Sequence, residues 1–153
     1  MNKQVLALIL TGSLLGGSIS AFAATPTTVT LPDPPMNCKQ FLLAPVVVDQ
    51  IREEALGLPE SAQYRVMYHA DKDYCDLTVS DKENKKTYHF TSESANNFEF
   101  DPNDRTFELL LYKTDQLSCE NTIEATYEDS TKSFVDAAYD FPLTEGGCSI
   151  NKN

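Results

Sequence analysis

The feature that most constrains the fold of this chain is a change of hydrophobic periodicity at Pro59. After it, apolar or aromatic residues alternate with polar ones in short segments separated by polar turns. A period of two residues is typical of strands that bury one face of a sheet. The pattern predicts about seven antiparallel strands, in the segments 64–70, 75–79, 88–90, 98–100, 107–112, 123–127 and 134–141. In the last of these the alternation slips around Ala137 and Ala138, which indicates a β-bulge.

The segment before Pro59 has a helical period instead. Its apolar residues recur at spacings of three and four, and charged residues lie between them. The apolar residues are Val47, Val48, Ile51, Ala55 and Leu56. Gly57, followed by Pro59, is typical of a helix end. We therefore predict one amphipathic helix near residues 46–56. The expected fold class is α+β but mainly β, with this N-terminal helix packed on an antiparallel sheet that forms a sandwich or a partly closed barrel.

The N-terminus has the pattern of an export signal. Lys3 precedes an uncharged apolar stretch over residues 5–19, and Ala21-Phe22-Ala23 is the small-x-small pattern at which signal peptidase cleaves. Three glycines within the stretch and the lack of a following positive cluster argue against a membrane anchor. We predict that residues 1–23 are a signal peptide removed before Ala24. The product is then periplasmic or secreted, with no membrane insertion after cleavage.

Cleavage before Ala24 would leave an extended leader and one domain. Residues 24–37 hold four of the eight prolines and are predicted to form a Pro-rich extended leader. Residues 38–153 are predicted to form a single mainly-β domain. It contains all four cysteines, and an even number of cysteines in an exported chain indicates disulfides. We expect two disulfides and favour Cys38–Cys75 with Cys119–Cys148, although the two other pairings stay open.

The charge of the chain limits its partners. It has 23 acidic and 12 basic residues, for a net charge of −11. Such a surface repels nucleic acid and anionic lipid and attracts basic partners. The composition therefore predicts no nucleic-acid partner. It favours a protein partner, and the negative charge of the chain indicates a basic one.

Motifs for catalysis are absent from the sequence. There is no G-x-S-x-G elbow, and no cofactor is predicted. His69 and His89 each follow a tyrosine, so both imidazoles are expected on the outer face of the sheet, where they are weak candidates for a metal site. Two hypotheses follow. The favoured one is a non-catalytic binding module of the bacterial envelope or secretome, such as an inhibitor, an adhesion accessory or an assembly factor. The alternative is a small exported hydrolase, with His69 and His89 as the candidate ligands if a metal ion assists.

The binding hypothesis predicts which side chains contact the partner. They combine carboxylates with exposed aromatic and apolar groups at strand positions, because such a face would attract a basic protein. The candidates are Met67, Glu108, Leu110, Tyr112, Glu120, Glu124 and Glu128.

Overall fold

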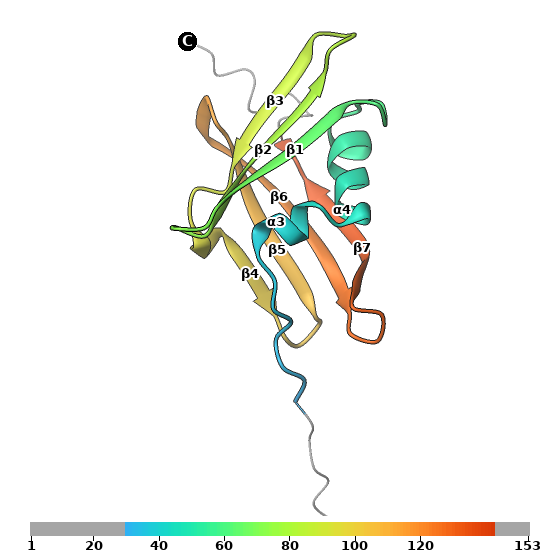
Figure 1. Ribbon diagram of the computed structural model, residues 1–153, viewed down its shortest axis with the longest axis vertical. Coiled ribbons are helices and arrows are strands. Elements are labelled where there is room, and N and C mark those ends of the chain that lie inside the picture. The colour runs from blue at the N-terminus through green and yellow to red at the C-terminus, as the bar shows by residue number, and fades with distance from the viewer. Residues whose placement is uncertain (1–29, 143–153) are drawn as a thin grey trace, which may run out of the picture. The chain divides into compact units, whose positions relative to one another are not determined.

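The computed structural model describes residues 30–142 of the chain, and in them it shows a mainly-β fold. An antiparallel sheet curves into a half-barrel, and a few short helices lie in the N-terminal part (Figure 1). The mainly-β, antiparallel character predicted from the alternation is confirmed. The strands are β1 (Gln63–His69), β2 (Tyr74–Asp81), β3 (Lys86–Thr91), β4 (Phe98–Asp101), β5 (Thr106–Lys113), β6 (Gln116–Glu128) and β7 (Ser133–Asp140).

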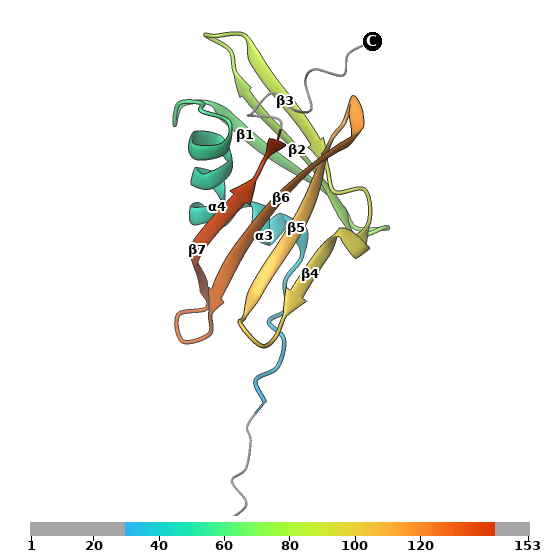
Figure 2. The ribbon, with the colours of Figure 1, turned by 180° about the vertical axis from the view of Figure 1, so that it is seen from behind.

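The sheet is a meander whose third position is divided between two strands. Its order is β1-β2-β3-β5-β6-β7, and β4 pairs with β5 on the same side as β3. β3 pairs only with the last residues of β5, through Phe90 and Thr91, whereas β4 pairs with the first half of β5. The 3-10 turn η2 (Ala95–Asn97) lies between β3 and β4. The sheet thus has two arms, β1–β3 and β4–β7, which run in different directions (Figures 1 and 2).

The bulge in the last strand is present, but two residues before the predicted place. Tyr127 pairs with Phe134 and Thr126 with Asp136, so Val135 is the extra residue. Ala137 and Ala138 pair in regular register with β6. The prediction was displaced because the alanines are too small to show which face they occupy.

Three helical segments precede the sheet: α3 (Cys38–Leu42), α4 (Pro45–Asp49) and a π-helical segment η1 (Gln50–Ala55). Asn37 caps α3, since its side chain accepts a hydrogen bond from the Gln40 amide while the Gln40 side chain accepts one from the Asn37 amide, both at 2.9 Å. Pro45 occupies the first turn of α4. Gly57 has φ +64°, which ends the helical region. The stripe predicted over residues 46–56 lies on α4 and η1, whereas α3 was not predicted.

The helices contact the two edge strands of the sheet. α3 contacts β1, while α4 and η1 contact β7. The core lies between the helices and the inner face of the sheet, where the side chains with the least exposure include Phe41, Val47, Ile51, Leu77, Leu109 and Ile123. Among residues 30–142, no helix combines the length and the apolar composition that crossing a membrane requires.

One disulfide, Cys38–Cys75, joins the start of α3 to β2, so this part of the predicted pairing is confirmed. Both cysteines are buried. Cys119 is also buried and is not a free thiol. Its predicted partner, Cys148, lies outside the described residues. The structure therefore describes one of the two predicted disulfides.

Tyr64 links β1 to the end of α3, and its hydroxyl donates a hydrogen bond of 2.7 Å to the Leu42 carbonyl. Burial raises the pKa of Tyr64 far above its ordinary value, an effect that Arg52 partly opposes. The neutral phenol therefore stabilises the fold fully below pH about 10, and this stabilisation is lost as the pH rises above that value.

We expect Tyr64→Phe to lower the free energy of unfolding by about 1 kcal/mol at pH 8, because the Leu42 carbonyl loses its donor. The difference in unfolding free energy between the two proteins should shrink at pH 11. At that pH the Tyr64 phenol ionises in the unfolded wild type, which lowers the stability of the wild type but not that of the variant. Urea denaturation at both pH values measures it. An equal difference in unfolding free energy at both pH values would contradict a pKa of Tyr64 that is raised by burial.

Candidate functional site

The outer face of the β4–β7 arm carries the densest group of acidic side chains at strand positions. Phe107, Leu109 and Leu111 of β5 are buried on the inner face, so the residues between them point outward. The register places Glu108 directly opposite Glu99 on one side and Glu124 on the other. Three glutamates from three adjacent strands therefore form a row across the sheet.

The neighbouring rows extend this acidic face. In the row below, Asp101 and Asp136 lie at the two ends, with threonines between them. On the other side, Glu120 lies opposite Tyr112 and Asp140 opposite Thr122. We call this surface the acidic face and define it by its seven carboxylates, Glu99, Asp101, Glu108, Glu120, Glu124, Asp136 and Asp140.

The acidic face is hollowed rather than flat. Three shallow depressions of about 240, 310 and 200 Å³ lie over it, and Glu124 lines all three. Glu108 lines two of them. Glu108 and Glu124 therefore border the concave parts of the acidic face.

The row of three glutamates carries net negative charge. Within the described residues, none of Glu99, Glu108 and Glu124 takes part in an ion pair. The pKa of Tyr112 is raised, first because partial burial disfavours the phenolate and then because Glu120 and Glu93 add negative charge nearby. The electrostatic potential at the acidic face therefore favours a positively charged partner.

Arg105, in the β4–β5 turn, pairs with Asp129 and not with a glutamate of the row. Its guanidinium donates two hydrogen bonds to Asp129, from Nε at 2.9 Å and from Nη2 at 2.7 Å. This pairing raises the pKa of Arg105. It also lies over the Phe100 ring, 4.8 Å from the centroid. Arg105 thus joins the β4–β5 turn to the β6–β7 turn.

The structure brings together five of the seven predicted contact residues. Glu108, Leu110 and Tyr112 of β5 lie on the outer face beside Glu120 and Glu124 of β6. The other two lie apart from this group.

Glu128, at the end of β6, accepts a hydrogen bond of 2.8 Å from the Thr131 hydroxyl in the hairpin turn. Met67 is on β1, in the other arm, with 61% of its surface exposed. Met67 therefore lies outside the acidic face, and Glu128 lies at its end, bound to the hairpin turn.

The sequence predictions missed four carboxylates of the acidic face, Glu99, Asp101, Asp136 and Asp140. A signal for the first two was available, since Phe98-Glu99-Phe100-Asp101 alternates and its phenylalanines pack against the core. Asp136 and Asp140 follow the displaced bulge, so their face could not be read from parity alone.

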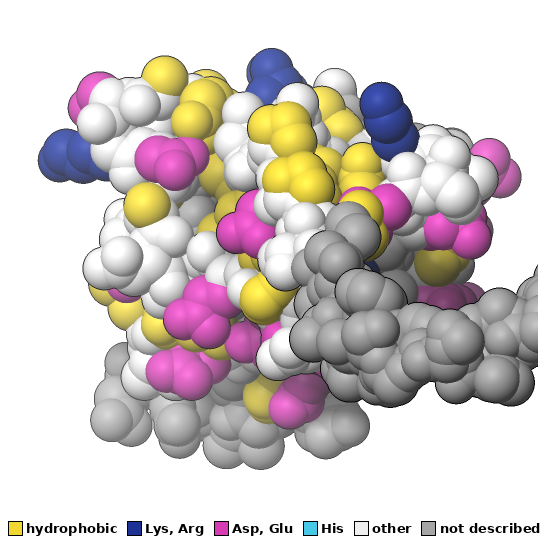
Figure 3. All heavy atoms as spheres, turned by 90° about the horizontal axis from the view of Figure 1, so that it is seen from below, with side chains coloured by type: hydrophobic (Ala, Val, Ile, Leu, Met, Phe, Trp, Pro, Cys, Tyr) yellow, Lys and Arg dark blue, Asp and Glu magenta, His cyan; other side chains and the backbone are white. Residues whose placement is uncertain are grey.

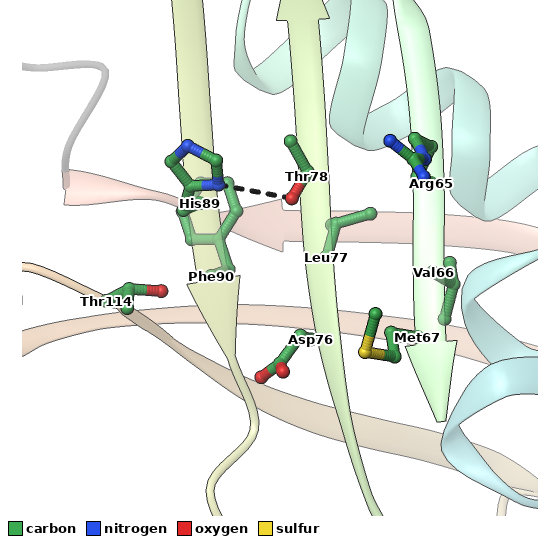
Figure 4. A pocket seen from close by; sticks show the side chains of 9 residues that line it. All are labelled: Arg65, Val66, Met67, Asp76, Leu77, Thr78, His89, Phe90 and Thr114. Atoms are coloured by element: carbon green, nitrogen blue, oxygen red, sulfur yellow. Dashed lines mark hydrogen bonds between the residues drawn. The ribbon is translucent and has the colours of Figure 1, made fainter. Parts of the chain in front are cut away.

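A separate hollow, of about 360 Å³, lies over the outer face of the β1–β3 arm. Arg65, Thr78 and His89 lie side by side across its three strands (Figure 4). Thr78 and His89 are joined by a hydrogen bond of 3.1 Å between Oγ1 and Nδ1. Met67 and Asp76 form the next row. The charges here are mixed, in contrast to the acidic face.

The two histidines are not brought together. His69 Nε2 is 2.7 Å from Asp76 Oδ2, and its ring stacks on Tyr74. His89 is in register with Arg65, four residues away along β1 and two strands across. These steps separate the histidines by about 13 Å along the strands and about 10 Å across them. In residues 30–142 no group of three or more His, Cys, Asp or Glu side chains is placed to hold a metal ion.

Comparison of the chain with protein-family models, with curated proteins and with solved structures found no match.

Proposed function

We propose that this protein is a non-catalytic binding module that recognises a basic protein partner through the acidic face. The observation that carries the proposal is the row of Glu99, Glu108 and Glu124, placed directly opposite one another with no ion pair to any of them among residues 30–142. Like charges directly opposite one another in a sheet destabilise it. A partner that supplies lysine or arginine side chains would convert this repulsion into attraction.

Export of the chain fits this role. The disulfide Cys38–Cys75 is consistent with an oxidising compartment. We infer that the protein acts in the periplasm or outside the cell, where it serves as an inhibitor, an adhesion accessory or an assembly factor. Its partner would be attracted over distances up to about the Debye length, so binding should depend on ionic strength.

The test uses the triple variant Glu99→Gln, Glu108→Gln and Glu124→Gln with an octalysine peptide as the probe. We expect the peptide to bind the wild type at low salt and to bind the variant at least tenfold more weakly. We also expect the variant to be more stable by about 1 kcal/mol, because two like-charge cross-strand pairs are removed. Calorimetric titration measures the first effect and urea denaturation the second.

A matched control removes the same charge elsewhere. The control is the triple variant Glu60→Gln, Asp71→Asn and Glu83→Gln, whose three positions lie in turns away from the acidic face. It should keep most of the affinity for the peptide and the stability of the wild type. If both triple variants lost affinity equally, the attraction would come from net charge and not from the acidic face. Binding that did not weaken at high salt would also count against the proposal.

A further inference from the structure

An apolar hollow lies between the helices and the β6–β7 hairpin, apart from the acidic face. It has a volume of about 400 Å³, within the range of small-molecule sites. Met36, Ala44, Pro45 and Val46 line one side of it. The other side is lined by residues of β6, β7 and the turn between them. These are Tyr127, Lys132, Ser133 and Phe134.

The aromatic wall of this hollow is held in place by the core. Phe134 packs edge-on against Phe41 and Tyr127, with ring centroids 5.3 and 5.4 Å apart. Met36 and Val46 also pack against the core cluster while staying partly exposed. The apolar surface is therefore preformed and open to solvent. Figure 3 shows the side of the molecule on which the β6–β7 turn lies, where exposed hydrophobic side chains are interspersed with acidic ones.

Two hydrogen-bond donors that line the same hollow have no partner among the described residues. Within the described residues, Lys132 Nζ takes part in no ion pair or hydrogen bond. The side chain of Gln40 uses its oxygen in the cap of α3, which leaves its NH₂ group free to donate. An ammonium and an amide donor beside an apolar wall complement one kind of group, a carboxylate attached to a hydrocarbon chain.

We propose that this hollow binds an amphiphilic carboxylate of the fatty-acid class. The hydrocarbon chain lies against Met36, Val46 and Phe134, and the carboxylate accepts hydrogen bonds from Lys132 and Gln40. This site is independent of the acidic face, which would repel the same ligand. It gives the protein a second, chemically opposite surface.

The test is a titration with decanoate, below the concentration at which it forms micelles, followed by NMR of the Met36 and Val46 methyl groups. We expect these methyl signals to shift in a saturable way. Decanol, which lacks the charge, and butyrate, which lacks the long chain, should each bind more weakly. Lys132→Gln should weaken decanoate binding about two- to fivefold, as expected for an exposed charge pair.

Two further variants separate the hollow from general effects. Lys82→Gln removes a lysine from the β2–β3 turn and should leave the affinity unchanged. Ala44→Leu fills the hollow and should abolish the methyl shifts while the thermal unfolding temperature stays close to that of the wild type. Equal binding of decanol and decanoate, unchanged affinity in Lys132→Gln, or shifts confined to other methyl groups would each overturn the proposal. Self-association through this hollow, seen by analytical ultracentrifugation, would overturn it as well.

Discussion

Replacing both Cys38 and Cys75 by alanine is expected to lower the free energy of unfolding by about 4 kcal/mol in the chain-entropy model of disulfides. The two residues are 37 positions apart, so the bond closes a loop that contains all the helices from α3 to η1 and the whole of β1. Without it, the unfolded chain gains the freedom of that loop. Urea denaturation of the oxidised wild type and the double variant measures the difference.

The alanine variant is preferred to serine because both sulfur atoms are in the buried core, where a hydroxyl without a partner would add a cost of its own. Comparing the alanine and serine variants separates this cost from the loss of the bond. A loss of less than about 1 kcal/mol in the alanine variant would show that α3 is held on β2 by packing alone.

The strands could be predicted because their signal is local. Phe107, Leu109 and Leu111 alternate with outward residues, and β5 buries them as that pattern requires. α3 could not be found by periodicity, since five residues make little more than one turn. Its only local signal was the capping pair Asn37 and Gln40. The start of β6 was also missed, because residues 116–122 are mostly polar.

The candidate site shows the same division between local and distant information. Alternation placed Glu108 and Glu124 on the outer face, but only the register of β4, β5 and β6 places them in one row with Glu99. The apolar hollow depends on distant contacts even more, since Gln40 and Lys132 lie more than ninety positions apart. No sequence pattern connects two such segments.

The second large effect concerns Phe41, which is fully buried at the centre of the aromatic core. Its ring contacts Phe98 of β4, Phe107 of β5 and Phe134 of β7, with centroid distances of 5.3, 6.5 and 5.3 Å. Phe41→Ala is expected to lower the free energy of unfolding by about 3–5 kcal/mol, through lost burial and the cavity left behind. Phe100→Ala, at a half-buried ring, is the control and should cost clearly less.

The position of Phe41 in α3 makes a further result of this variant testable. Cys38 binds α3 to β2 in the first arm, while Phe41 packs α3 against the second arm, so five residues connect the two halves of the sheet. Removing either contact should loosen α3 and weaken the other. The Cys38→Ala, Cys75→Ala and Phe41→Ala triple variant should therefore lose less stability than the two separate losses combined. Strict additivity in urea denaturation would mean that α3 is held to each arm independently.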